Sequence, residues 1–567
     1  MKTYLFILSC FPFFLFAQTP DNCRASTAFR SFSSELVSAG MGTGGDLFLT
    51  EDQEHLRVKS NTDEQMMTTI FAAGLVAAGY NADGNIAAAW SEYGRTSVTF
   101  DYAPGYLDLT EGTDDPEKCL NWDRVWYVNG NDIRAHLQEI AAHSAPLTKR
   151  PDLYAYPAQG NPHFLEFAGF NLPNLGRDFA PYYDANGDAI YNPDSGDYPL
   201  PANVDRNAVP DEMMWMVFND YDQPRSNLIS EPLGLEIQLT AFRYDCTESA
   251  LLNRTIFTQH KIINRTSNNI DSLAVGSWID FDIGHSTDDY LGTAPEINTF
   301  YAYNSDENDG RNNAANFNLI EGTELPVSAV TFLNQSLEYT MPYTPFTTTE
   351  PPLPINVPRN PASIFNYLNG KWYEGSRLTV SGFGFNPDSI NYSNHIFPDN
   401  PNDPDGWSAI NISYPEGEIR GFASKQFGTL GASGIIRLDQ AWSFHQGAGN
   451  DHLENVDLMY EQIPMLQQIY NNQFAGLSCV TTAVENTIAS VPFIDIFPNP
   501  ATDNLTIKSE DLNIQHIEII DLQGRIHWSK NVLTKSVEVK IDNLPAQVYF
   551  IKTYTDNGMV TKRFIKL

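Results

Sequence analysis

The sequence is poor in basic residues, and this shortage excludes partners that need a cationic surface. Lys and Arg number 34 against 70 Asp and Glu, which gives a formal net charge of −36 at pH 7 over 567 residues. Nucleic acids and anionic membrane surfaces are bound by faces rich in Lys and Arg. The composition therefore predicts no nucleic-acid partner. It leaves open whether the acids form a solvated surface or bind divalent cations.

Long apolar runs are absent beyond the first residues of the chain. The nearest candidate is residues 66–80, which are too short and too rich in small residues for a membrane-spanning helix of about 20 apolar residues. We interpret this segment as a buried pair of strands or a core segment. No transmembrane segment is expected in the mature chain.

The sequence also lacks the motifs by which common enzymes are identified. It contains no H-E-x-x-H, G-x-S-x-G or P-loop motif. Two carboxylates for glycoside hydrolysis could be drawn from so many acids by chance, so we select none. The aromatic residues at 182–183, 372–373 and 407 can stack on sugars, although a β-rich core also uses aromatic residues. No catalytic residue is predicted.

Cysteine is scarce, with 5 in the chain. The first lies within residues 1–18, where Lys2 precedes an apolar stretch and Ala17-Gln18 gives a cleavage zone, a pattern that predicts a cleaved signal peptide. The remaining four are Cys23, Cys119, Cys246 and Cys479. An exported protein meets an oxidising environment, so we expect two disulfides in any of three pairings, with isolated buried thiols as the alternative. Their wide spacing argues against a zinc site.

Short runs with apolar residues at alternate positions are abundant. Residues 97–102, 235–242, 255–263 and 274–281 show this pattern, which predicts antiparallel strands. Helical spacing occurs at 132–142 and after Asp451, which forms a capping pair with Glu454. The predicted fold is mainly β. A large β-rich body with a few helices spans residues 19–478, with a joint in the proline-rich stretch 344–361. A linker at 479–490 leads to a small immunoglobulin-like β-sandwich at 491–567.

Two acidic segments predict metal sites, with calcium as the structural ion. In the first, alternate Asp and Asn residues in a tight loop would direct several oxygens at one ion, as in an EF-hand loop, although Ala189 stands where Gly is expected and Ser195 at the last position. An Asp/Asn/Gly turn without an ion is the alternative. In the second, neighbouring carboxylates would repel one another unless a cation or solvent separates them. The predicted ligands are Asp184, Asn186, Asp188, Asn192, Asp194 and Asp197 in the first segment and Asp280, Asp282, Asp288 and Asp289 in the second.

The most specific pattern lies at the end of the chain. It reads F-I-D-I-F-P-N-P-A-T-D-N-L-T-I, then I-E-I-I-D-L-Q-G-R-I, and finally M-V-T-K-R-F-I-K-L. Residues 491–567 contain nine basic and nine acidic residues, so the whole net charge lies upstream. This segment resembles the type A C-terminal sorting domain of type IX secretion cargo. The sorting-motif residues are Pro498, Asn499, Pro500, Asp521, Gly524, Arg525, Leu544, Tyr549, Lys562 and Lys566.

The body resembles large secreted type IX cargo proteins of undefined function, through motifs such as C-L-N-W-D-R-V-W at 119–126 and D-A-N-G-D-A-I-Y-N-P at 184–193. The resemblance implies passage through the type IX translocon, after export through the periplasm. It also implies removal of the tail by the sortase machinery, with anchoring to surface lipopolysaccharide or release. We expect a secreted or cell-surface adhesion or binding protein, with a surface glycan or a protein as ligand. The alternative is an extracellular hydrolase that acts on polysaccharide through an unrecognised active site.

Overall fold

The computed structural model describes most of the chain. The described residues are 26–49, 55–59, 66–91, 93, 101–109, 115–143, 146–174, 179–221, 230–246, 249–307, 309, 325–343, 358, 360–380, 382–477, 479, 494–499, 501–509, 513–521, 525–555 and 558–567. The predicted signal peptide, Cys23, most of the predicted joint at 344–361 and the linker after residue 479 lie outside them. The chain divides into two compact units, residues 1–480 and 481–567, and each is described by itself.

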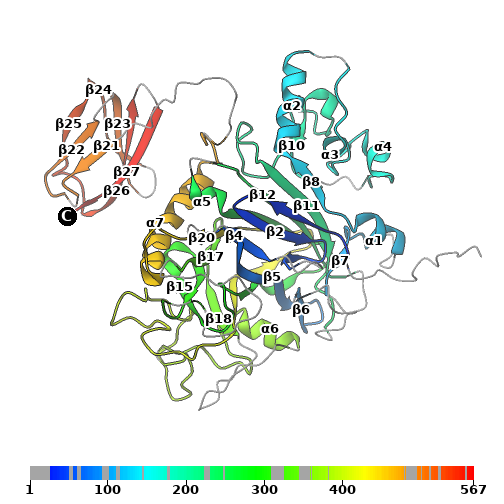
Figure 1. The fold of residues 1–567 in the computed structure, drawn as a ribbon, viewed down its shortest axis with the longest axis horizontal. Helices are drawn as coiled ribbons and strands as arrows, with labels where there is room; N and C mark the ends of the chain where they lie inside the picture. The colour runs from blue at the N-terminus through cyan, green and yellow to red at the C-terminus, as the bar shows by residue number, and fades with distance from the viewer. Residues whose placement is uncertain are drawn as a thin grey trace, which may run out of the picture. The chain divides into compact units, whose positions relative to one another are not determined.

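Two large antiparallel sheets form the body (Figure 1). Within the described residues, the first sheet has the order β1-β2-β3-β5-β14-β19-β18, with β4 on β2 and β5 and with β6 on β5. The second has the order β15-β16-β17-β20-β13-β12-β11-β7, with β8 on β11. A short separate pair, β9 with β10, lies outside both sheets.

The bounds of the strands follow the chain. The first sheet contains β1 (Phe29–Ser33), β2 (Val37–Gly42), β3 (Asp46–Phe48), β4 (Leu56–Lys59), β5 (Met66–Tyr80), β6 (Ile86–Trp90), β14 (Ile270–Phe281), β18 (Tyr339–Tyr343) and β19 (Ile419–Leu430). The second contains β7 (Ala103–Pro104), β8 (Trp126–Asn129), β11 (Glu212–Asn219), β12 (Leu235–Arg243), β13 (Thr255–Asn264), β15 (Asp289–Ala294), β16 (Thr299–Asn304), β17 (Val327–Phe332) and β20 (Ile435–His445). The short pair is β9 (Tyr182–Tyr183) and β10 (Tyr198–Pro199).

The two sheets pack face to face, because alternate side chains of their strands point to a shared core. Phe48 of β3 meets Trp442 of β20 edge-on, with ring centroids 5.1 Å apart. On β14, the Ser277 hydroxyl donates to Gln440 Oε1 of β20 at 3.1 Å. A single hydrophobic core therefore joins strands of both sheets, and the body is a large β-sandwich.

Helices cover the outer faces of the sandwich. The helix α6 (Pro361–Tyr367) packs on β5 and β6 of the first sheet. The helix α7 (His452–Asn471) packs on β16, β17 and β20 of the second sheet. Asp451 caps α7 by accepting the N–H groups of Leu453 and Glu454 at 2.9 and 2.8 Å, while Glu454 accepts the N–H of Asp451 at 3.0 Å. The predicted capping pair is confirmed. The remaining helical segments are α1 (Pro116–Trp122), α2 (Gly130–Ala141), α3 (Pro151–Tyr154), α4 (Phe164–Ala168), α5 (Ala250–Asn253), η1 (Pro193–Ser195) and η2 (Pro295–Ile297).

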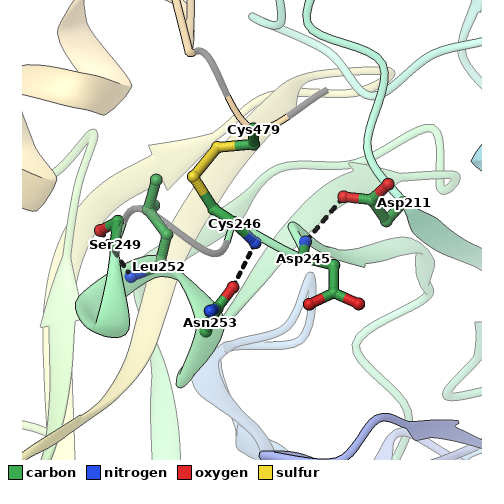
Figure 2. The surroundings of a disulfide bond; sticks show 7 residues. All are labelled: Asp211, Asp245, Cys246, Ser249, Leu252, Asn253 and Cys479. Atoms are coloured by element: carbon green, nitrogen blue, oxygen red, sulfur yellow. Dashed lines mark hydrogen bonds between the residues drawn. A yellow bond between two sulfur atoms is a disulfide. The ribbon is translucent and has the colours of Figure 1, made fainter. Parts of the chain in front are cut away.

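A disulfide ties the end of the body to its second sheet. Cys246, in the turn between β12 and α5, is bonded to Cys479 across 233 residues of sequence (Figure 2). The Cys246 N–H donates to the Asn253 side chain, and the Asp245 N–H donates to Asp211 Oδ2 at 2.6 Å. This is one of the pairings that the sequence left open. Cys119 is also disulfide-bonded.

The second unit is a small β-sandwich. One sheet has the order β21 (Ile494–Phe497), β22 (Asn504–Ser509), β25 (Ser536–Lys540), and the other has the order β24 (Ile526–Thr534), β23 (Ile514–Ile520), β26 (Gln547–Thr555), β27 (Gly558–Lys566). A common core that includes Leu505, Ile519 and Phe564 lies between them. The mainly β fold predicted for both parts of the chain is confirmed.

Candidate functional site

A pocket with a polar floor opens on the outer face of the second sheet. Across β11, β12, β13 and β20 two rows of side chains lie in register on this face. Residues directly opposite one another on neighbouring strands project to the same side, and so do residues two apart on one strand. The rows are Trp215, Thr240, Gln259 and Asp439, and Val217, Gln238, Lys261 and Arg437.

The walls of this sheet pocket come from the segments around β9 and β10. Its volume is about 440 Å³, and its lining includes Phe179, Tyr182, Tyr183 and Asp184 on one side and residues 200–204 on another. Because β9 pairs with β10, Tyr183 is held opposite Tyr198, and the Arg206 guanidinium donates to the Tyr183 hydroxyl at 3.0 Å. The aromatic pair at 182–183 therefore stands beside a polar floor.

Two buried polar atoms of the lining residues have no hydrogen-bond partner within the described part of the chain. They are Gln259 Oε1 and Trp215 Nε1. The amide of Gln259 is fixed by its other end, since Nε2 donates to the Ala202 carbonyl at 2.7 Å. A hydroxyl group of a bound ligand can donate to one of these atoms and accept from the other.

The acidic loop, residues 184–197, begins at the rim of the pocket. Its Asp184, Asp188 and Asp197 bring carboxylate oxygens within 4.8 Å of one another. Backbone N–H groups hold them. Asp184 accepts from Gly187 at 2.6 Å and from Ala189 at 2.8 Å, and Asp197 accepts from Ala185 and Asn192 at 2.8 Å each. A carboxylate oxygen that accepts one N–H keeps a second lone pair for another partner.

The pKa values of two carboxylates in the acidic loop are shifted in opposite directions. The N–H of Ala189, helped by that of Gly187, holds the pKa of Asp184 below its usual range. Burial raises the pKa of Asp197, and the carboxylates of Asp184 and Asp188 add to the rise. A cation would relieve this repulsion.

The structure places the other predicted ligands of this loop elsewhere. Asp194 accepts two contacts of 2.7 Å from Lys149 Nζ and one of 2.5 Å from the Tyr154 hydroxyl. Burial alone would raise the pKa of Asp194, but Lys149 and Tyr154 lower it overall. Asn186 Oδ1 accepts from the Asp188 N–H and Asn192 Oδ1 from the Asp194 N–H. Asn186 and Asn192 therefore shape turns, and Asp194 is neutralised by a lysine.

The second predicted metal segment begins with an ion pair. Asp280 of β14 lies directly opposite Arg420 of β19, and Arg420 Nε contacts Asp280 Oδ1 at 3.0 Å. The Tyr93 hydroxyl donates to the other oxygen of Asp280. Burial raises the pKa of Asp280, against the attraction of Arg420. The carboxylate of Asp280 is thus already paired with a cationic side chain.

The other three predicted ligands of this segment are buried near the turn from β14 to β15. Burial and neighbouring carboxylates raise the pKa of Asp282 and Asp289 well above the usual range. Asp289 Oδ2 accepts the Ile283 N–H at 2.9 Å, and Asp288 lies 3.5 Å from His285 Nδ1. Among the described residues, the acidic, His and Cys groups whose ligand atoms converge are Asp184, Asp188 and Asp197 alone.

Several of the predicted sorting-motif residues make contacts within the small sandwich. Asn499 Oδ1 accepts the Ile565 N–H at 2.9 Å, which fixes the chain after β21 to β27. The buried Asp521 accepts from Arg525 Nε at 2.7 Å and lies 2.8 Å from His527 Nε2. Leu544 packs against the core, and the ring of Tyr549 stacks on that of Phe564 with centroids 5.5 Å apart. Pro498 directly follows β21, Lys562 lies on β27, and Lys566 is buried. Pro500 and Gly524 lie outside the described residues.

The small sandwich coincides with a known domain family. Residues 495–567 match the family model of the secretion system C-terminal sorting domain. The chain is a type IX secretion cargo protein. Such cargo is exported and then secreted or attached to the outer surface, and its sorting domain interacts with the secretion machinery. In the described part of the chain, no helix has the length and apolar character needed to cross a membrane.

Comparison of the whole chain is less informative. No curated protein matches the sequence. A polysaccharide lyase matches at 6% identity and a TM-score of 0.20, over 65% of this chain and 37% of that chain. PorZ, an essential bacterial surface component of the type-IX secretion system of Porphyromonas gingivalis, matches at 13% identity and a TM-score of 0.12, over 69% of this chain and 48% of that chain. The chain spans less than half of either structure, and scores this low carry no argument.

Proposed function

We propose that the exported body is a binding protein that takes a glycan in the sheet pocket and is stabilised by calcium in the acidic loop. The observation that carries the proposal is the pair of unpartnered buried atoms, Gln259 Oε1 and Trp215 Nε1, beside the aromatic residues at 182–183. Sugars present a flat apolar face to aromatic rings and hydroxyls to polar groups. Leaving a buried polar group unpaired costs about 1–3 kcal/mol, which a partnering hydroxyl offsets.

The pocket favours binding over hydrolysis. Glycosidases use two carboxylates that flank the scissile bond. Among the described residues that line the sheet pocket, Asp184 is the single carboxylate. The lining therefore supports a receptor for a sugar more than a catalyst.

The glycan proposal predicts a loss of affinity in pocket variants. On a glycan array, the full chain is expected to retain a defined set of glycans. Tyr183→Ala is expected to weaken binding about twofold to tenfold, since an aromatic face contributes about 0.5–1.5 kcal/mol. The matched control is Tyr392→Ala, because Tyr392 is also accessible and stacks with an arginine, Arg377, at 4.3 Å. Equal affinities of the two variants, or retention of no glycan by the wild-type chain, would contradict the proposal.

The calcium proposal predicts a stability that depends on the ion. Removal of calcium with EDTA is expected to lower the melting temperature of the body, because an ion at about 100 times its Kd stabilises the folded state by about 2.7 kcal/mol. Asp188→Asn is expected to abolish the response by removing one of the three converging carboxylates. Asp405→Asn, in an exposed turn where the Asp405 N–H donates to Asp403, is the matched control and should respond like the wild type. An unchanged melting temperature in EDTA would overturn this part of the proposal.

A further inference from the structure

The last turn of α7 and the residues after it pack on the outer face of the second sheet, next to the sheet pocket. We call residues 470–474 the terminal segment. Phe474 is fully buried, and its ring lies edge-on to Phe257 of β13 and to Phe242 of β12, with centroids 5.0 and 5.5 Å apart. Phe257 is two residues from Gln259 on the same strand, so the two side chains project to one face. The terminal segment therefore covers the part of this face that adjoins the pocket floor.

The terminal segment also holds a wall of the pocket. Asn203 belongs to the wall at 200–204, and its Nδ2 donates to the Tyr470 carbonyl at 3.3 Å. The Asp205 N–H, just beyond that wall, donates to the Gln473 carbonyl at 2.7 Å. Two hydrogen bonds thus fix the position of this wall relative to the end of α7.

A third link runs from the terminal segment to the pocket floor. The Tyr470 hydroxyl donates to Asp439 Oδ2 at 2.6 Å, and Gln259 Nε2 contacts the same oxygen at 3.4 Å. Nε2 of Gln259 also donates to the carbonyl of Ala202 in the wall, at 2.7 Å. Burial raises the pKa of Asp439, and the hydrogen bond from Tyr470 opposes this rise, so the hydroxyl favours the charged carboxylate. Both groups that orient the Gln259 amide are therefore held by the terminal segment.

Two features hold the terminal segment itself in place. Gln473 and Phe474 have φ angles of 56° and 59°, in the left-handed region that few non-glycine residues adopt. Such residues persist where the surrounding structure fixes them, and they cluster at sites that clamp ligands. Further along the chain, Cys479 is bonded to Cys246, which follows β12 (Figure 2). The disulfide therefore ties the end of the body to a strand of the pocket floor.

We propose that the terminal segment is a clamp that keeps the sheet pocket in its binding geometry, with Tyr470 as a positioning residue for Gln259. The Cys246–Cys479 disulfide locks this clamp. The inference rests on the proposed function, of which it names the residues that regulate affinity from outside the pocket lining. Tyr470 does not touch the glycan, because it acts on Gln259 Oε1 through Asp439.

A cycle of variants of the full chain tests the role of the Tyr470 hydroxyl. The probe is the glycan that the array selects as the tightest binder, and calorimetric titration measures its affinity. Tyr470→Phe keeps the ring and removes the hydroxyl, and it is expected to weaken binding about twofold to tenfold, as the loss of one hydrogen bond implies. In a Gln259→Leu background the same change should have no further effect, because the hydroxyl acts through Gln259. A general loss of structure would weaken binding in both backgrounds.

Two more variants serve as the control and as a test of the lock. Tyr460→Phe is the matched control, because Tyr460 is also on α7 but its ring meets Tyr301 of β16, with centroids 6.4 Å apart. It should bind like the wild type. The double variant Cys246→Ser/Cys479→Ser is expected to lose at least as much affinity as Tyr470→Phe, with thermal unfolding as the check that the body is folded. Where the serine variant does not fold, the cycle at Tyr470 decides.

The outcomes separate this inference from the proposed function. Wild-type affinity of Tyr470→Phe, or equal losses with and without Gln259, would overturn the inference and leave glycan binding intact. Wild-type affinity of a folded serine variant would also overturn it. Failure of every glycan to bind the wild-type chain would overturn the proposed function and this inference with it.

Discussion

Deleting residues 491–567 is expected to abolish delivery of the protein to the cell surface and the medium. The match of residues 495–567 to the sorting-domain family makes this unit the address that the secretion machinery reads. It has its own hydrophobic core, separate from that of the body, so its removal leaves the core of the body intact. The truncated chain should therefore accumulate in the periplasm as a folded protein. Cell fractionation with immunoblotting measures the distribution.

A transplant provides the matched control for this deletion. Fusion of residues 491–567 to an unrelated periplasmic β-sandwich protein is expected to bring that carrier to the outer surface, where added protease can reach it. A carrier with the same fusion and Asp521→Ala should be delivered poorly, because Asp521 anchors Arg525 and His527 in the small sandwich. Full surface delivery of the truncated cargo would contradict the sorting role.

Replacing Arg420 by methionine is expected to lower the free energy of unfolding of the body by about 3–5 kcal/mol. The substitution leaves Asp280 buried, with a side chain 3% exposed, and removes the cation directly opposite it. An uncompensated buried carboxylate is strongly unfavourable in its charged form. Urea unfolding at pH 7 measures the effect.

A second substitution on the same strand shows how much of the destabilisation comes from the burial of the ion pair and how much from the loss of a charge. Lys425 of β19 pairs with Glu338, but the pair is more exposed, so Lys425→Met should cost about 0–1 kcal/mol. The loss in Arg420→Met should also depend on pH. Arg420 opposes the rise that burial causes in the pKa of Asp280, so its removal raises that pKa further. The deficit is therefore complete above the folded-state pKa of Asp280 in the variant, and it shrinks as the pH falls toward the folded-state pKa of the wild type. Equal losses for both variants, or a loss that grows on acidification, would contradict the account.

The sequence predicted local structure well where the pattern was strictly periodic. The runs at 235–242, 255–263 and 274–281 fall within β12, β13 and β14, and α7 begins where the capping pair at 451 and 454 predicts. The stretch 66–80 was expected as a pair of strands or a core segment, and it is one strand, β5, of 15 residues. Its small residues are buried on both faces, so the alternation that marks a half-exposed strand is missing.

The sheet pocket could not be predicted because its residues are far apart in sequence. Thr240, Gln259 and Arg437 become neighbours only through the register of β12, β13 and β20. The alternation at 235–242 and 255–263 predicts two strands, but it does not say which polar side chains of those strands meet. Likewise, the ion pairs of Asp194 with Lys149 and of Asp280 with Arg420 join distant segments. Loop spacing alone could not separate these carboxylates from the three that converge.

The most direct test of the central claim is a crystal structure of the full chain with the tightest-binding glycan of the array. The account predicts a sugar in the sheet pocket, with its hydroxyls within hydrogen-bond distance of Gln259 Oε1 and Trp215 Nε1 and a ring against the aromatic residues at 182–183. A glycan bound at another face, with these two atoms still unpartnered, would contradict it.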